Sequence, residues 1–288
     1  MNLRSPRAPL GVTLGLVLGV LTGCKSTPRG PAPEPSSSSP AAPASAPAAG
    51  IGSASPQAAA SSVTDTLPTS AGPVTLTPIH HGTLAFGFQG KTLVVDPWTS
   101  APPGALPKAD LVLLTDLHPD HFDPAALELV RKDGTVLVVP EVLRAKLQGA
   151  KVLKNGERTT ELGIEIEAVP MYNLKRGPEA GKLYHDKGRG NGYVLGFADK
   201  RVYVSGDTEC IDEMKALERI DLALVCMNLP FTMTPEEAAS CVSAFKPKVV
   251  IPYHYRGSDL SVFSRALSAV DGVEVRVRDF YPAGASKQ

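Results

Sequence analysis

Two imidazoles and two carboxylates stand close together in the segment Asp116-Leu117-His118-Pro119-Asp120-His121. The segment follows the apolar run 111–115, which is typical of a buried strand, and it precedes Asp123-Pro124, a typical helix start. A turn at this point can aim several side chains at one place, and Pro119 argues against a surface helix. Imidazole and carboxylate groups together suit zinc, or manganese and iron in an oxygen-rich site. The segment therefore predicts a metal site.

Further residues of the same kinds are spread along the chain. His80 and His81 precede a hairpin pattern, Asp207 follows a strand pattern, and His254 ends another strand pattern. His185 is the remaining one of the six histidines. We expect these distant imidazoles and carboxylates to converge on one pocket that holds catalytic cations.

In this order the segments resemble the motifs of the metallo-β-lactamase superfamily. Residues 116–121 resemble its His-x-His-x-Asp-His signature, with Asp116 at the place of the first histidine. Ile79-His80-His81-Gly82 and 93–97 resemble its opening hairpin, Ser205-Gly206-Asp207-Thr208 its Gly-Asp-Thr loop, and Ile251-Pro252-Tyr253-His254-Tyr255 its last metal-binding strand end. The resemblance covers residues 76–282. It is nearest to the branch with ascorbate-phosphate lactonase-like and N-acyl-phosphatidylethanolamine phospholipase D-like hydrolases.

The resemblance implies two metal ions, with zinc as the preferred metal and manganese or iron as alternatives. It assigns Asp116 and His118 to one ion, assigns Asp120, His121 and His254 to the other, and makes Asp207 the bridging ligand. A shared anionic ligand fits a pair of divalent cations about 3.5–4 Å apart. A metal-bound hydroxide would then be the nucleophile, and Asp120 would be the catalytic residue that orients it or takes its proton.

Two departures from the superfamily pattern concern the first ion. Asp116 still offers an anionic ligand, but it makes this site harder and weaker for zinc than a histidine would. Asn173 stands where the superfamily commonly has a ligand histidine, and an amide is a poor zinc ligand. We favour His185 over Asn173 as the third ligand. If neither residue binds, the protein would work with one tightly held ion.

Neighbours of the ligands are candidates for supporting roles or substrate contacts. His81 is expected near the ions, whereas His80 alternates away from it along the strand and is expected to be structural. Asp96 is expected to hydrogen-bond a ligand histidine, the alternative being a simple turn residue. Arg189 and Tyr253 are candidates to meet an anionic or polar substrate.

The elements that must position these residues alternate between strand and helix patterns. Strands are predicted at 83–89, 91–96, 111–115, 135–139, 163–169, 192–196, 201–205, 221–227, 249–252 and 273–278. Helices are predicted at 123–132, 141–148, 234–245 and 260–269. The pattern alone gives an α/β fold, and with the resemblance it indicates a four-layered αββα metallo-β-lactamase sandwich. Residues 227–233 indicate a pocket wall or plain core.

The first part of the chain differs from the rest. Arg4 and Arg7 precede a short apolar run, and Leu21-Thr22-Gly23-Cys24 resembles a lipobox, so residues 1–23 are predicted to be a lipoprotein signal peptide and Cys24 to be lipidated. The alternative is a cleaved, soluble secreted protein. Residues 24–72 are rich in Pro, Ala and Ser and predict a disordered tether, followed by a folded domain at 73–284. Lys25 favours the outer over the inner membrane of the cell envelope.

The three remaining cysteines are odd in number, so they cannot form a complete disulfide framework. Cys226 and Cys241 lie in an apolar and a helical run, and we expect both to be buried thiols. Cys210 follows the Asp207 loop and is a candidate to touch metal or substrate.

Lys plus Arg equals Asp plus Glu at 29 each, and this neutral balance gives no support for a nucleic-acid partner. We expect a metal-dependent hydrolase that cleaves an ester, lactone, amide or phosphodiester bond in a small-molecule or lipid-like substrate. The alternative is a catalytically silent metal-binding envelope lipoprotein of the same fold, in which Asp116 and Asn173 mark a decayed site.

Overall fold

The computed structural model describes residues 64–284 of the 288-residue chain. The predicted signal peptide, Cys24 and most of the predicted tether lie outside these residues. None of the helices within 64–284 is long and apolar enough to cross a membrane.

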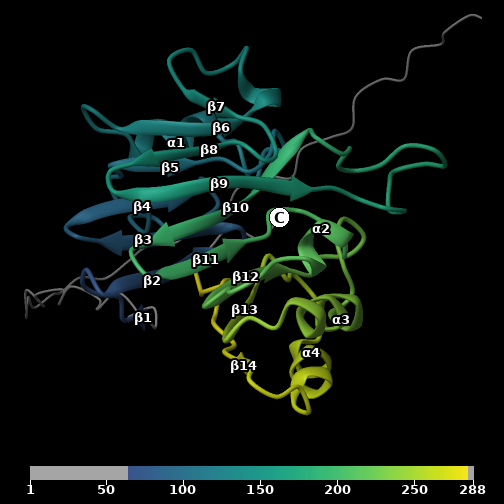
Figure 1. Ribbon diagram of the computed structural model, residues 1–288. Helices are drawn as coiled ribbons and strands as arrows, with labels where there is room; N and C mark the ends of the chain where they lie inside the picture. The colour runs from purple at the N-terminus through teal and green to yellow at the C-terminus, as the bar shows by residue number, and fades with distance from the viewer. Residues whose placement is uncertain (1–63, 285–288) are drawn as a thin grey trace, which may run out of the picture. The chain divides into compact units, whose positions relative to one another are not determined.

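The described residues form two seven-stranded mixed sheets that follow one another in the chain (Figure 1). The first sheet contains β1 (Asp65–Leu67), β2 (Val74–His80), β3 (Thr83–Phe88), β4 (Lys91–Val95), β5 (Leu111–Leu113), β6 (Val136–Pro140) and β7 (Lys151–Leu153) in that order. The second contains β8 (Arg158–Glu161), β9 (Ile164–Met171), β10 (Gly190–Phe197), β11 (Lys200–Val204), β12 (Leu222–Cys226), β13 (Val249–Tyr253) and β14 (Glu274–Val275). In both sheets antiparallel pairs come first and parallel pairs follow.

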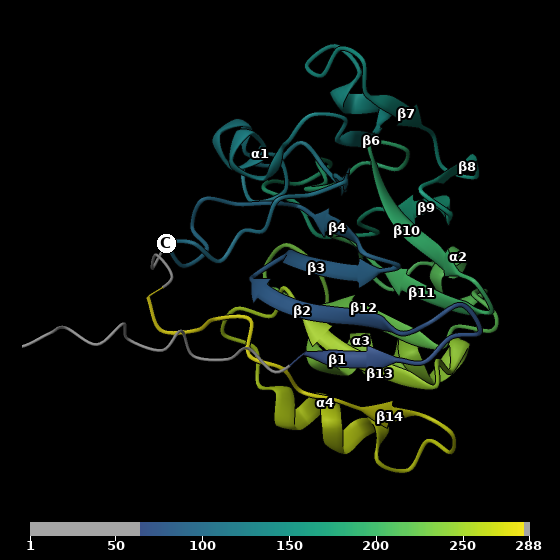
Figure 2. The same cartoon turned by 90° about the vertical axis from the view of Figure 1, so that its left-hand side faces the viewer.

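The core lies between the two sheets, and strand alternation fills it. On β9, Ile164, Ile166 and Ala168 are buried while the intervening Glu165 is exposed, which is the two-residue period of a strand with one covered face. Inward side chains of the first sheet, such as Phe86 and Leu93, belong to the same buried cluster as Phe197 of the second. Figure 2 shows β2 and β3 lying over β11 and β12.

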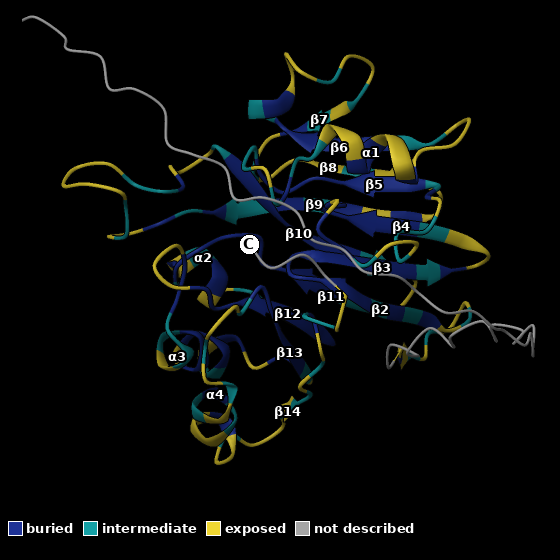
Figure 3. Cartoon of the chain, turned by 180° about the vertical axis from the view of Figure 1, so that it is seen from behind, coloured by how far each residue is buried: buried dark blue, intermediate teal, exposed yellow. Residues whose placement is uncertain are grey.

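Helices cover the outer faces of the sheets. On the first sheet, α1 (Pro124–Val130) packs Leu127 and Val130 into a second buried cluster. On the second sheet, Phe245 of α3 (Pro235–Phe245) contacts Tyr203, and α2 (Asp212–Lys215) and α4 (Leu260–Leu267) lie beside α3. Figure 3 shows buried strands and exposed outer faces on α1 and α4. The four-layered αββα prediction is confirmed.

Several predicted boundaries differ from the structure. The folded part begins earlier than predicted, because β1 lies within the stretch assigned to the tether and pairs with β2. A strand of three residues is too short to show alternation in the sequence. The helix predicted at 141–148 is a 3-10 turn, η1 (Glu141–Leu143), followed by irregular backbone. The last strand is shorter than predicted because only Glu274 and Val275 pair with β13. The helix predicted at 260–269 ends at Leu267.

Candidate metal centre

The residues predicted to bind metal meet where several strands end. Residues 116–121 follow β5, Asp207 follows β11, His254 follows β13, and His81 lies in the turn between β2 and β3. The carboxyl ends of parallel strands in an α/β sheet are where ligand sites commonly form. The long connection between β9 and β10 adds His185 to the same place.

One group of three is fully buried and consists of His121, Asp207 and His254. The Nε2 atom of His121 lies 3.4 Å from Oδ2 of Asp207, and the Nε2 atom of His254 lies 3.5 Å from Oδ1 of the same carboxylate. Their ligand atoms all lie within 4.8 Å of one another. We call this group the buried half of the centre.

The buried half contains polar atoms without hydrogen-bond partners. These are Nε2 of His121, Oδ1 of Asp207, and both ring nitrogens of His254. Burying a polar group without a partner costs about 1–3 kcal/mol, and more when the group is charged, so such atoms are rare in proteins. A cation among them would satisfy one imidazole nitrogen each of His121 and His254 together with the Asp207 oxygen, so the residues present fit a metal ion.

A second group of three consists of Asp116, His118 and His185, and we call it the open half. The Nδ1 atom of His118 lies 2.9 Å from Oδ2 of Asp116 and 3.1 Å from Nε2 of His185. The side chain of His118 is 36% exposed, whereas those of Asp116 and His185 are buried. This half therefore faces solvent through His118.

Asp207 connects the two halves. Its Oδ2 atom lies 3.5 Å from Nε2 of His185 and 3.4 Å from Nε2 of His121. One carboxylate oxygen thus faces both groups, as the predicted bridging role requires. Gly206 next to it has φ +60°, and a Cβ there would lie 2.5 Å from the Met171 sulfur, so the loop needs glycine to bring Asp207 in.

The comparisons with known proteins agree with this geometry. The model of a beta-lactamase superfamily domain matches residues 75–254. UPF0173 metal-dependent hydrolases of Pelotomaculum thermopropionicum and Thermococcus onnurineus are each 32% identical to the chain; the first alignment covers 68% of this chain and 93% of the relative, the second 60% and 82%. The chain belongs to the UPF0173 metal-dependent hydrolases of the metallo-β-lactamase superfamily.

A solved structure supports the same assignment. The crystal structure of a candidate metal-dependent hydrolase from Parabacteroides distasonis is 40% identical, with a TM-score of 0.71, and the match covers 76% of this chain and 99% of that one. The prediction that this chain is a metal-dependent enzyme is therefore confirmed.

Hydrogen bonds orient the histidines of this hydrolase. Asp96 Oδ2 accepts from Nδ1 of His121 at 2.8 Å and from the Thr115 hydroxyl at 2.5 Å, which leaves Nε2 of His121 toward Asp207. Asn173 Oδ1 accepts from Nδ1 of His185 at 2.7 Å and from its backbone N–H at 2.8 Å. The two bonds made by Nδ1 orient the rings and turn Nε2 of His121 and of His185 into the centre.

These bonds bear on two open alternatives. Asp96 makes the supporting hydrogen bond that we expected of it, which goes beyond the role of a simple turn residue. Asn173 is turned to His185, so the geometry favours His185 over Asn173 as the third ligand of the open half.

Asp120 lies at the mouth of the centre with its side chain 27% exposed. Its Oδ2 atom is 3.2 Å from Nε2 of His81 and 3.3 Å from Nε2 of His254. The other ring nitrogen of His81 lies 2.6 Å from the hydroxyl of Tyr281. His81 is thus near the ligands, as expected, and Tyr281 holds it there.

Arg189 has a partner that the sequence did not suggest. Its Nε and Nη2 atoms donate to the two oxygens of Asp116, each at 3.0 Å. The predicted substrate contact is thus an internal ion pair that neutralises the residue replacing the usual histidine. A carboxylate has about four lone-pair positions, so Asp116 keeps room for a metal contact beside the guanidinium.

Electrostatics separates the histidines of the two halves. Burial lowers the pKa of His121, but the charges of Asp207 and Asp120 outweigh it and raise the pKa well above its ordinary value. Burial lowers the pKa of His185 to about 4, and burial with the charge of His254 lowers the pKa of His81 to about 3. Burial opposes ionisation of Asp116, yet the hydrogen bond with His118 and the charge of His121 lower its pKa to about 2.

Three of the eight non-glycine residues with positive φ in the described part of the chain lie at the centre. His81, Asp96 and His254 have φ values of 55°, 45° and 49°, in the left-handed region that residues other than glycine seldom adopt. Such conformations cost about 1–3 kcal/mol each and gather at functional sites. Backbone hydrogen bonds from His254 to His81 and from His81 to Phe280 hold two of them.

Some predicted roles are corrected by the structure. Tyr253 is fully buried and its hydroxyl accepts from the Gly206 backbone N–H, so it supports the Asp207 loop and cannot meet substrate. Cys210 and Cys241 form a disulfide, so the expected buried thiol at Cys241 and the metal contact at Cys210 are wrong. An odd count does not exclude one bridge beside one thiol, and Cys226 is the buried free thiol. His80 stacks on Trp98 outside the ligand groups, as expected.

Glu209 is a supporting residue that the sequence analysis missed. It is 2% exposed, and its carboxylate accepts from the backbone N–H groups of Leu174, Lys175 and Arg176. It therefore fixes the start of the connection that carries His185. A glutamate two residues after a ligand was the only signal, and it does not reveal these partners.

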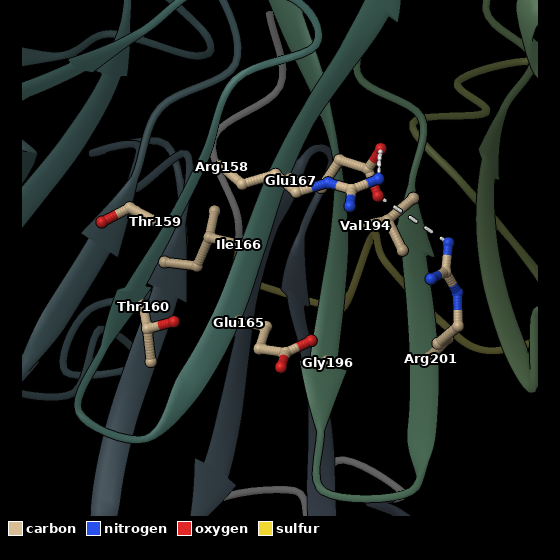
Figure 4. Close-up of a pocket in the computed structure, with 9 residues that line it drawn as sticks. All are labelled: Arg158, Thr159, Thr160, Glu165, Ile166, Glu167, Val194, Gly196 and Arg201. Carbon is tan, nitrogen blue, oxygen red and sulfur yellow. Dashed lines mark hydrogen bonds and ion pairs between the residues drawn. The ribbon is translucent and has the colours of Figure 1, made fainter.

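A separate cavity of about 330 Å³ lies on the outer face of β8–β11. Figure 4 shows Glu167 between Arg158 and Arg201 in this cavity, with Glu165 beside Gly196. Glu167 bonds Arg158 at 2.7 Å, so these charges compensate one another. The cavity contains none of the candidate ligands, and the chemistry belongs to the strand-end site.

Proposed function

We propose that this hydrolase cleaves an ester, lactone, amide or phosphodiester bond with two bound ions, zinc in the first place and manganese or iron as alternatives. The observation that carries the proposal is the set of unpartnered buried nitrogen and oxygen atoms on His121, Asp207 and His254. The ring nitrogens of the structural His80 also lack partners, but they stand outside the ligand groups, whereas the ligand atoms of His121, Asp207 and His254 converge within 4.8 Å of one another.

The two halves give each ion its own ligands. His121 and His254, with Asp120, would hold one ion, and Asp116, His118 and His185 would hold the other, with Asp207 shared between them. Bound ions would polarise the scissile group and make a water molecule acidic enough to react near neutral pH. The surrounding residues would then orient the water molecule and accept its proton.

Asp120 is the residue we assign to proton transfer. It is the partly exposed carboxylate of the centre, and His81 and His254 approach its Oδ2 atom. A neutral His81 donates from Nε2 to Asp120 while its Nδ1 accepts from the Tyr281 hydroxyl. This arrangement points one oxygen of Asp120 at the ligands and holds it ready to accept a proton from water.

We further propose that the chain is a lipoprotein of the cell envelope, with a signal peptide at 1–23, an anchor at Cys24 and a tether before the folded domain. The Cys210–Cys241 disulfide supports export, because such bonds persist in oxidising compartments and are rare in the cytosol. Replacing Cys24 by Ser should move the protein from the membrane to the soluble fraction with the domain unchanged. A variant that stays with membranes would refute the anchor.

The activity is tested by metal removal and return. Chelated protein should lose hydrolysis of a panel of esters, lactones, amides and phosphodiesters, and zinc or manganese should restore it. Metal content measured beside the rates should reach two ions per chain. A folded, metal-loaded protein that is inert on the whole panel would refute the proposed reaction.

A further inference from the structure

Exposed apolar side chains gather on two loops beside the open half. The described residues contain six exposed large hydrophobic side chains, and three are Leu174 (56% exposed), Leu229 (47%) and Phe231 (40%). Leu174 lies near the start of the β9–β10 connection, which extends past the end of β9 in Figure 1, and the other two lie between β12 and α3. Single exposed leucines are ordinary on protein surfaces, whereas grouped ones mark binding sites.

Hydrogen bonds join these loops to the metal centre. Asn173 donates from Nδ2 to the Phe231 carbonyl at 2.8 Å while its Oδ1 accepts from His185. The Tyr184 ring, next to His185 in the chain, packs against the Phe231 ring at 4.9 Å. We call Leu174, Tyr184, Leu229 and Phe231 the apolar rim. Through Asn173 the rim is one residue away from a candidate ligand.

The rim is held in place by its own loop. The backbone N–H groups of Phe231 and Thr232 both donate to the Asn228 carbonyl at 2.9 Å. Met227 and Met233 on either side are fully buried core residues. Leu229 and Phe231 are therefore presented outward by an anchored turn, and both methionines belong to the core, which is one of the two roles expected for this stretch.

Cations on the same loops are already paired. Lys175 bonds Glu237 at 2.8 Å, Arg176 bonds Glu237 at 2.5 Å, and Lys187 bonds Glu213 at 2.6 Å. These three side chains thus have their counter-charges within the chain, and Leu174, Leu229 and Phe231 are the exposed large hydrophobic side chains beside them. An anionic substituent would therefore make fewer favourable contacts here than a hydrocarbon chain would.

We propose that the apolar rim binds a hydrocarbon chain of the substrate, so that the hydrolase acts on molecules with an acyl or alkyl group of several carbons next to the scissile bond. This inference rests on the proposed hydrolysis and names its substrate class. The metal centre would take the polar group to be cleaved, and the rim would take the chain.

Alkyl hydroxamates test the rim without knowledge of the bond that is cleaved. The hydroxamate group binds metal ions, and its chain length can be varied. We expect metal-loaded protein to bind octanohydroxamate at least about tenfold more tightly than acetohydroxamate in calorimetry, since each buried methylene favours binding. Phe231→Ser and Leu174→Ser should remove most of this difference and leave acetohydroxamate binding unchanged.

Matched controls are available on other elements. Leu162→Ser matches Phe231 with 38% exposure, and Leu129→Ser on α1 matches Leu174 with 57%. Both controls should keep the full chain-length difference. An equal loss in controls and rim variants, or no preference for the longer chain in the wild type, would overturn the proposal.

Two other outcomes are distinguishable. If acetohydroxamate itself does not bind, the metal centre fails, and the proposed function fails with the rim. If the rim variants keep the chain-length difference but lose binding to phosphatidylethanolamine and phosphatidylglycerol vesicles, the rim is a membrane contact and the substrate assignment is wrong. With p-nitrophenyl esters as substrates, the rim variants should raise KM for octanoate and leave kinetics on acetate unchanged.

Discussion

The two halves of the metal centre differ in how their polar groups are compensated. In the buried half, His121, Asp207 and His254 are at most 3% exposed, and several of their polar atoms have no partner. In the open half, His118 reaches solvent and Asp116 is bound on both oxygens by Arg189. One half needs an ion to satisfy its atoms, and the other has already satisfied part of its charge.

In the two-ion centre that we propose, this difference would give the two ions different tasks. An ion in the buried half gains the full stabilisation of groups that water cannot reach, so we expect it to bind first and stay. An ion in the open half would compete with Arg189 and keep contact with solvent. We therefore expect it to be the ion that exchanges ligands and meets substrate.

The largest expected effect is the loss of the shared ligand. Asp207→Ala should remove both ions and lower kcat/KM by roughly a thousandfold or more, because both halves lose their common carboxylate. Metal analysis and steady-state kinetics measure this. Asp207→Asn keeps the shape without the charge and should retain more metal. Full metal content in the alanine variant would contradict the bridging assignment.

Single histidine variants should separate the halves. His254→Ala should leave little metal in either half of the centre. His118→Ala should instead keep about one ion per chain. His80→Gln is the matched control, because His80 is buried near the centre but outside the ligand groups, and it should keep both ions. Equal metal loss in the His254 and His118 variants would remove the distinction between the halves.

Releasing Asp116 should make the halves more alike. In Arg189→Met the carboxylate loses a two-pronged charged partner, so the second ion should bind about tenfold more tightly, and the ion-free protein should be less stable by about 3 kcal/mol. Metal titration and thermal unfolding with and without metal measure the two effects. Arg189→Lys should give a second-ion affinity and an ion-free stability between those of the wild type and Arg189→Met. A weaker second ion in Arg189→Met would show that the arginine builds this half.

The smallest effect concerns protons. His121 has a raised pKa without metal and so carries a proton that the first ion must displace, while the pKa of His185 near 4 leaves it neutral at pH 6 to 8. Affinity for the first ion should therefore rise as pH rises toward the His121 pKa, with about one proton released, and affinity for the second should change less. Calorimetry in two buffers of different ionisation heat counts these protons. Equal release for both ions would refute this reasoning.

The sequence predicted what is local and periodic. Residues 116–121 lie in one turn, so their spacing indicated four residues of the candidate metal centre, and buried strands such as β5 and β12 show as apolar runs. The αββα layers followed from the order of strands and helices together with the resemblance. These signals depend on neighbours in the chain, where the backbone fixes geometry.

The features that were missed join residues far apart in the chain. Arg189 reaches Asp116 across 73 positions, and Tyr281 reaches His81 across 200. Neither pair leaves a spacing rule, because sheet packing and not the local backbone brings the residues together. Tyr253 was misjudged for a related reason: its neighbour His254 faces the site, and the alternation of the strand turns Tyr253 into the core.

The Cys210–Cys241 bond ties the end of the Asp207 loop to α3 and closes a loop of 31 residues. Cross-links of this span typically contribute about 3 kcal/mol to stability. Protein produced in a reducing cytoplasm would fold with this disulfide reduced, and Asp207, the proposed bridging ligand, would lie on a less restrained segment. A preparation route that oxidises the pair is therefore part of any fair assay of this chain, as much as the choice of metal.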